Sequence, residues 1–128
     1  MSSDVSVPPV LALPEGLVGL PATRTLDVQP VAGGAFVELT DRDEPALGWL
    51  AAAADDVRPG MTEALRAGGR VAADEVLLVL LSSPQPAVVT ANLAGPIAVA
   101  PDGTARQLVL EDPSYGVRAA VARLAPAG

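Results

Sequence analysis

The sequence predicts an all-β domain, mostly antiparallel and barrel-like, with a few short helices. Short apolar or alternating segments recur along the chain, and turns rich in Pro and Gly separate them. The expected helices are too few and too short to cover both faces of a parallel sheet. With 128 residues, half of them apolar, the chain has the size of one domain.

The predicted strands follow from the periodicity of apolar side chains. Residues 25–29 alternate between polar and apolar types, and residues 35–39 do the same after a Gly-Gly turn signal. Residues 76–81 are continuously apolar, which is typical of a strand buried on both faces. Residues 87–93 are expected to pair with that strand.

The strongest local signal predicts a hairpin. Pro101-Asp102-Gly103 lies between two apolar segments, residues 97–100 and 106–110. Proline presets φ for a turn, Asp bonds the following backbone, and Gly accepts a positive φ. The two leucines of the return segment fall on its inward face.

Three helical segments are also expected. Asp43 can cap a helix that Pro45 opens, and its apolar stripe would contain Leu47, Leu50, Ala51 and Ala54. Met61 and Leu65 lie one turn apart before a Gly-Gly stop. The third stripe lies near the C-terminus and contains Val117, Val121 and Leu124.

The composition excludes most catalytic chemistry. The chain has no His and no Cys, and all eight basic residues are arginines. It therefore lacks the usual metal ligands, a nucleophilic thiolate, the base of a catalytic triad and a Schiff-base lysine. The carboxylate pairs at 55–56, 74–75 and 111–112 are sequence neighbours whose side chains diverge, so none forms an acid-base dyad. We expect no enzyme activity, no cofactor and no metal, since the spacing of residues 41–44 also fails the calcium-loop pattern.

The charge balance favours protein partners over nucleic acid. The net charge is −7, and no cationic cluster is present to neutralise phosphates. Seven acidic residues against two arginines lie in residues 38–63. This region is either a solvated surface or a docking patch for a basic protein.

The ends of the chain differ in composition from its middle. Residues 1–12 are expected to form a disordered N-terminal arm, residues 13–124 a single domain, and residues 125–128 a tail. The first 14 residues lack the basic start of a signal peptide, and the longest apolar run, residues 76–81, is far too short to span a bilayer. A cytoplasmic protein without membrane contact is expected, and the absence of Cys is compatible with it.

Two stretches resemble a known family. Residues 13–21 have the sequence Leu-Pro-Glu-Gly-Leu-Val-Gly-Leu-Pro. Residues 89–99 contain Thr-Ala-Asn-Leu-Ala-Gly-Pro-Ile, and residues 107–118 have the sequence Gln-Leu-Val-Leu-Glu-Asp-Pro-Ser-Tyr-Gly-Val-Arg. The last two ranges and the hairpin between them form one stretch, residues 89–118, and this stretch and residues 13–21 are both similar to motifs of the bacterial flagellar assembly factor FliW family. In the middle of the chain there are two alignments: either Trp49-Leu50 resembles the family's Trp-Leu-Gln segment, or Phe36 aligns with the strand that follows that segment and displaces the assignment of Trp49.

The resemblance implies a non-enzymatic binding protein. Such proteins bind cytosolic flagellin and, in many bacteria, also the translational repressor CsrA. When flagellin accumulates it occupies the factor, and CsrA is free to repress flagellin synthesis. The partner-binding residues that the matched motifs imply are Asn92, Glu111, Asp112, Tyr115 and Arg118. The alternatives are a barrel-like interaction module with a changed partner and a small carboxylate enzyme.

The same residues also have structural interpretations. Asn92 can bond the backbone at a strand end instead of presenting its amide to a partner. Tyr115 and Arg118 can cover the end of the barrel, with Arg118 pairing with Glu111 or Asp112.

Overall fold

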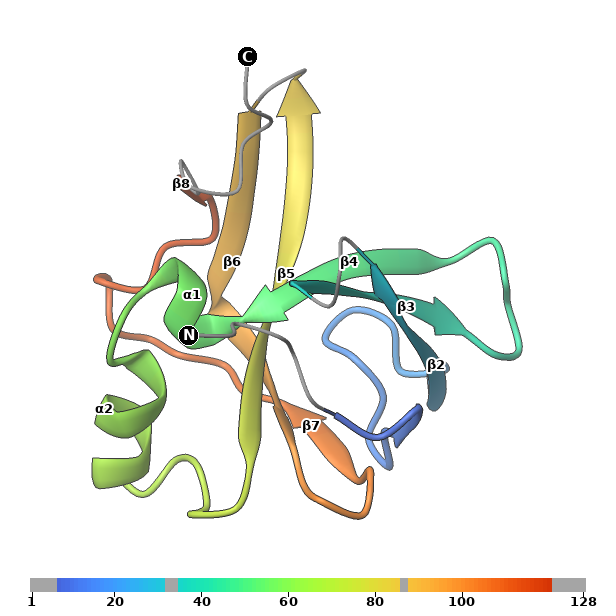
Figure 1. Cartoon of the computed structure of the whole chain (residues 1–128), viewed down its shortest axis with the longest axis horizontal. Helices are drawn as coiled ribbons and strands as arrows, with labels where there is room; N and C mark the ends of the chain where they lie inside the picture. Colours follow the sequence, from blue (N-terminus) through green and yellow to red (C-terminus); the bar gives the residue numbers. More distant parts are fainter. Residues whose placement is uncertain (1–6, 32–34, 86–87, 121–128) are drawn as a thin grey trace.

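One antiparallel sheet dominates the computed structural model, which describes residues 7–31, 35–85 and 88–120 (Figure 1). Seven strands follow one another in the order β1 to β7, and an eighth, β8, pairs with β6. The strands are β1 (Val10–Ala12), β2 (Thr25–Val31), β3 (Phe36–Asp41), β4 (Gly48–Ala53), β5 (Val76–Gln85), β6 (Val88–Val99), β7 (Ala105–Gln107) and β8 (Ala119–Ala120). Two short helices, α1 (Ala54–Val57) and α2 (Met61–Ala67), connect β4 to β5.

The sheet curls into a nearly closed barrel, which confirms the expected fold class. Its first and last strands meet where Ala12 forms a parallel bridge with Thr104. The Ala12 N–H donates to the Gly103 carbonyl over 2.9 Å. Beside this bridge, the Val18 N–H donates to Gln107 Oε1 over 2.8 Å, so the loop after β1 also joins β7.

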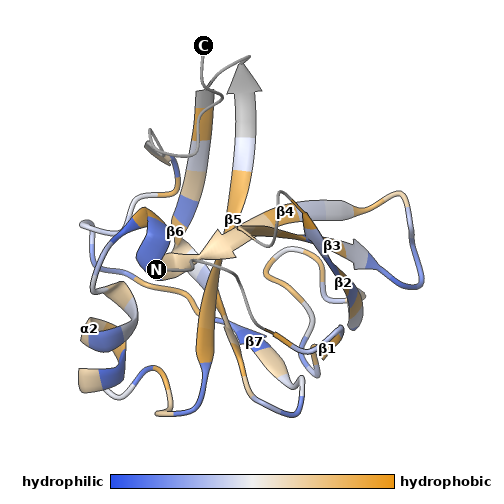
Figure 2. Cartoon of the chain, viewed as in Figure 1, coloured by the Kyte–Doolittle hydropathy of each residue, from blue (hydrophilic) through white to orange (hydrophobic). Residues whose placement is uncertain are grey.

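Two apolar clusters lie on the two faces of the sheet. The inner cluster fills the barrel and consists of Leu11, Leu13, Leu17, Leu26, Val37, Leu39, Ala51, Leu78, Ile97, Val99 and Ala105. The outer cluster lies between β4–β6 and α1–α2 and consists of Ala52, Ala54, Met61, Leu65, Val71, Leu77, Val79, Leu81, Ala91, Leu93, Ala98, Leu108 and Leu110. In Figure 2 the lower part of β5 is strongly apolar and the loop that leads into it is hydrophilic, while α2 carries both hydrophilic and apolar residues. None of the described helices has the length and apolar content needed to cross a membrane.

Most of the predicted strands are confirmed. The segments at 25–29 and 35–39 form β2 and β3, and Leu77, Leu78 and Val79 are buried, as expected of a strand covered on both faces. β6 pairs with β5, as expected for residues 87–93. The two Gly of the 33–34 turn signal and Ala87 lie outside the described residues.

The predicted hairpin is also confirmed. β6 pairs with β7 through the pairs Ile97–Gln107, Ala98–Arg106 and Val99–Ala105. β7 ends earlier than expected, yet the N–H groups of Leu108 and Leu110 still donate to carbonyls of β6 over 2.8 Å. Both leucines are buried and share one face, as predicted, but this face belongs to the outer cluster and not to the interior of the barrel.

The helix predicted to start near Asp43 is wrong. Residues 48–53 form β4, which lies between β3 and β5, and only Ala54–Val57 is helical. Burial explains the outcome, because Ala51 contributes to the inner cluster and Ala52 to the outer one. The alanines gain more from packing on both faces of the sheet than their helix propensity offers. The helix with Met61 and Leu65 is confirmed as α2.

Two expectations about the ends of the domain also change. The last three residues of the expected N-terminal arm form β1, because Leu11 is buried in the barrel and pairs with Leu26. The third predicted helix is wrong within the described residues, since Val117 lies in a turn that leads into β8. Its other two stripe residues, Val121 and Leu124, and the expected tail at 125–128 lie outside the described residues.

Candidate functional site

The chain after β7 runs back along one edge of β6 and carries four of the five predicted site residues. After Leu110 it leaves the strand and returns where the Leu93 N–H donates to the Gly116 carbonyl over 2.8 Å. β8 then pairs with β6 at Thr90 and Ala91. The loop at residues 111–115, where the chain is not paired with β6, contains Glu111, Asp112 and Tyr115. Arg118 follows just before β8.

Asp112 organises the turn in the loop at residues 111–115. Its Oδ1 accepts the Ser114 N–H over 2.9 Å, and its carbonyl accepts the Tyr115 N–H over 3.0 Å. The first bond is that of an Asx turn, and the second is the backbone bond of a β-turn over residues 112–115. The bonds from the Ser114 N–H and hydroxyl, helped by the charge of Arg58, hold the pKa of Asp112 below its usual value. Asp112 and its neighbour Glu111 are both exposed.

Arg58 fastens this turn to the rest of the molecule. The side chain comes from the connection between α1 and α2, and its Nη1 donates to the Ser114 carbonyl. Its guanidinium carbon lies 4.7 Å from the centroid of the Tyr115 ring, which is a cation–π distance. Tyr115 is half-buried and packs against the outer cluster. One structural interpretation expected Tyr115 to cover the end of the barrel. Tyr115 does cover apolar side chains, but these belong to the outer cluster.

Arg118 has a different environment from the one expected. It is exposed, and within the described residues it forms no ion pair with Glu111 or Asp112. The ion pairs found there involve Arg42, Arg66 and Arg106. The arginine charge that acts on Asp112 belongs to Arg58.

Asn92 holds a large bulge in β6. Leu78 pairs with Ile97 and Leu80 pairs with Asn92, so four residues of β6 lie opposite Val79 alone. Asn92 Oδ1 accepts the N–H groups of the second and third residues of this bulge, Ala94 and Gly95, over 3.1 Å each. The structural interpretation of Asn92, a bond to the backbone, is the one observed.

An exposed apolar patch that the sequence did not indicate surrounds Asn92. The side chains of Val18, Val109 and Val117, which we call the valine patch, are 64%, 58% and 63% exposed. They line one pocket of about 210 Å³ together with Asn92 and Gln107. They are the three most exposed large apolar side chains in the described part of the chain, although they come from three distant segments. No sequence signal groups these three valines. Alternation with Leu108 and Leu110 turns Val109 to the opposite face, but Val117 was expected in a helical stripe and Val18 lies in an apolar stretch that predicts core packing.

Polar contacts fix the segments that carry the valine patch. Gln107, two residues before Val109, holds the segment of Val18, because its Oε1 accepts the Val18 N–H. Its Nε2 donates to the Gly95 carbonyl of β6 over 2.9 Å. Arg70 donates to the Val109 carbonyl over 3.1 Å. The patch therefore lies on a backbone that is held in place, which lowers the entropic cost of binding.

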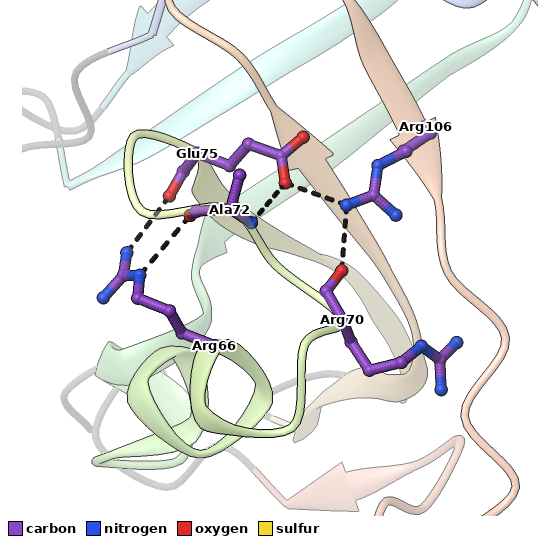
Figure 3. Close-up of polar contacts among 5 residues, drawn as sticks. All are labelled: Arg66, Arg70, Ala72, Glu75 and Arg106. Atoms are coloured by element: carbon purple, nitrogen blue, oxygen red, sulfur yellow. Dashed lines mark hydrogen bonds and ion pairs between the residues drawn. The ribbon is translucent and has the colours of Figure 1, made fainter.

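Figure 3 shows how Arg70 is held in turn. Arg106 donates to the Arg70 carbonyl and to Glu75 Oε1, both over 2.8 Å, and the Ala72 N–H donates to the same carboxylate. Arg66 donates to the carbonyls of Ala72 and Glu75. Burial by itself raises the pKa of Glu75, but the bonds from Ala72 and Arg106 outweigh it, and the pKa lies below its usual value. Within the described ranges, no three acidic side chains gather closely enough to hold a metal ion.

Comparison with known proteins identifies the family. A family model described as "FliW protein" matches residues 2–121. The chain belongs to the FliW family. A relative from Geotalea uraniireducens (strain Rf4), named "Flagellar assembly factor FliW", is 34% identical over 123 residues. That match covers 90% of this chain and 76% of the relative.

A solved structure supports the fold of this FliW-family chain. It is titled "Crystal structure of the flagellar assembly factor FliW" and superposes with a TM-score of 0.71 at 18% identity. The superposition covers 91% of this chain and 89% of the other. At that identity the likeness concerns the fold, so the partner-binding residues remain predictions.

Proposed function

We infer that this protein is a flagellar assembly factor that binds flagellin in the cytoplasm and regulates flagellin synthesis by exchanging flagellin for CsrA. Membership of the FliW family supports this proposal, as does the name of the relative from Geotalea uraniireducens. The function requires protein surfaces that recognise other proteins.

The observation that carries the proposal is the valine patch. Soluble monomers seldom group their most exposed apolar side chains, and such patches mark interaction sites. Burying each of these valines in a complex contributes about 1 kcal/mol, since more than half of each side chain is still exposed. The polar groups around the pocket then select partners by their geometry. An apolar segment of flagellin is the occupant that we assign to this patch.

The predicted partner-binding residues lie beside this surface. Asn92 lines the pocket, and the segment that contains Glu111, Asp112 and Tyr115 joins Val109 to Val117. Arg118 directly follows Val117. Asn92 and Gln107 are the polar side chains that line the pocket itself, and we assign to the other four residues contacts with flagellin beyond it.

The acidic character of the chain supports the second half of the proposal. A net charge of −7 favours encounter with a basic protein, and CsrA binds RNA. Flagellin then displaces CsrA when flagellin accumulates, and CsrA resumes repression.

Titration calorimetry with flagellin encoded in the same genome tests the proposal. We expect a one-to-one complex, and we expect Val109→Ser and Val117→Ser each to weaken it about fivefold, because each removes about 1 kcal/mol of apolar burial. Val76→Ser is the matched control, since Val76 is also exposed but lies on β5 outside the patch.

Two results would contradict the proposal in different ways. The absence of binding heat with folded protein refutes flagellin binding. Normal binding with unchanged affinity in both patch variants removes the valine patch as the site. For the exchange, flagellin added to a complex of this protein with CsrA should release CsrA.

A further inference from the structure

Among the residues that the structure describes, no layer covers the outer face of the β2–β3–β4 part of the sheet. The helices and the chain after β7 pack over β4–β6 and enclose the outer cluster. In Figure 1, α1 and α2 lie on one side of the molecule and the β3–β4 hairpin extends on the other. The pairings Gln29–Glu38, Glu38–Leu50 and Leu50–Leu81 place these four side chains in one row across this face.

The apolar surface continues from the covered part of the sheet into the uncovered part. Leu81 is buried in the outer cluster, but its neighbour in the row, Leu50, is 39% exposed. Phe36, two residues before Glu38 and on the same face, is only partly covered by the outer cluster. The helical layer therefore ends before the apolar part of the face does.

The charge on this face is negative and uncompensated. Glu38 is exposed, and its side chain has no hydrogen bond or ion pair with any described residue. Arg42, at the end of the same strand pair, is engaged with Asp27, whose Oδ1 accepts from its Nη2 over 2.6 Å. Glu38 and Leu50 both line a pocket of about 490 Å³ that reaches into the hairpin. A carboxylate thus lies directly beside an exposed leucine.

We propose that this face, with Glu38 and Leu50 at its centre, binds a basic amphipathic helix of a partner protein. Side chains opposite each other on neighbouring strands have Cβ atoms about 5 Å apart, and side chains one helical turn apart have a similar spacing. A Leu and a Lys or Arg at that spacing contact Leu50 and Glu38 at the same time. Such a helix extends the layer that α1 and α2 begin, as sheets are covered in other domains.

Charge decides between this occupant and its alternatives. A second copy of the chain presents the same carboxylate, so two Glu38 side chains would repel each other in a symmetric dimer. Nucleic acid is repelled by the same charge. The surface is separate from the valine patch, because none of the residues lining the two pockets is shared. Flagellin binding at the patch and helix binding at this face are therefore tested independently.

NMR titration of the full-length, isotopically labelled protein tests the proposal. The probe is a synthetic peptide of about 16 residues, long enough to form helix on binding, in which Leu and Lys recur one turn apart on one face. We expect amide shifts at Gln29, Glu38, Leu50 and Leu81, and none at the valine patch. A peptide with Glu in place of each Lys should produce none of these shifts.

Variants separate the specific contact from general attraction to an acidic protein. Glu38→Gln should weaken binding two- to fivefold, in the range of an exposed ion pair. Glu38→Lys should abolish binding of the Lys peptide and create binding of the Glu peptide. Glu63→Gln makes the same charge change on α2 and should leave the affinity unchanged. The proposal is overturned if the Lys peptide does not bind, if the shifts lie elsewhere, or if Glu38→Gln and Glu63→Gln weaken binding equally.

Discussion

Replacing Asn92 by Ala tests whether its amide supports the bulge of β6. In the native structure Asn92 Oδ1 accepts two backbone N–H groups, at 3.1 Å each, from half-buried Ala94 and buried Gly95. Ala at this position leaves both donors without that acceptor. An unsatisfied buried donor costs about 1–3 kcal/mol, and because one of these two is only half-buried we expect a total loss of about 2 kcal/mol. For a chain of this length, that loss lowers the Tm by roughly 6–12 °C.

The matched variant is Asn92→Asp, which keeps an oxygen in the same place. It should stay within about 0.5 kcal/mol of the native protein, because a carboxylate accepts backbone N–H groups well. Urea unfolding of the three proteins, followed by circular dichroism, gives the comparison. If Asn92→Ala unfolds at the native midpoint, or if the Asp variant loses as much stability as the Ala variant, the amide does not hold the bulge.

Three further perturbations follow from the packing and the polar network. Gly103→Ala should cost more than about 1 kcal/mol, because φ is +93° and the new Cβ would lie 2.7 Å from the Val10 carbonyl oxygen. Gly60→Ala, with φ of +83° but open space around it, should cost less in the same urea assay. Leu78→Ala should cost about 2–5 kcal/mol by calorimetry, since it leaves a cavity in the fully buried inner cluster. Because the folded pKa of Glu75 is lowered, its carboxylate stabilises the protein above its unfolded pKa, and this contribution is lost as the pH falls through the folded pKa. Glu75→Gln should therefore be less stable than the native protein at neutral pH, with the difference disappearing in acid; a difference that is constant with pH would contradict this.

The sequence alone determined the features that depend on residues adjacent in the chain. The turn at Pro101-Asp102-Gly103 specifies its hairpin because three consecutive residues each supply a conformation that the turn requires. β5 was predictable because its apolar run is strong enough to indicate burial on both faces. The motifs at 13–21 and 107–118 carried the family for the same reason, since a motif lies in consecutive residues.

Other features were decided by contacts between distant residues. Residues 48–53 have helical composition, yet they form β4 because Ala51 and Ala52 fill space on opposite faces of a sheet whose other strands lie elsewhere in the sequence. The valine patch exists because the fold brings together segments about 90 residues apart, as the bond from Val18 to Gln107 shows. Periodicity reports which face a side chain occupies, but the packed neighbours decide whether that face is covered. Leu81 and Leu50 are neighbours in one row, and only the end of the helical layer makes the first buried and the second exposed.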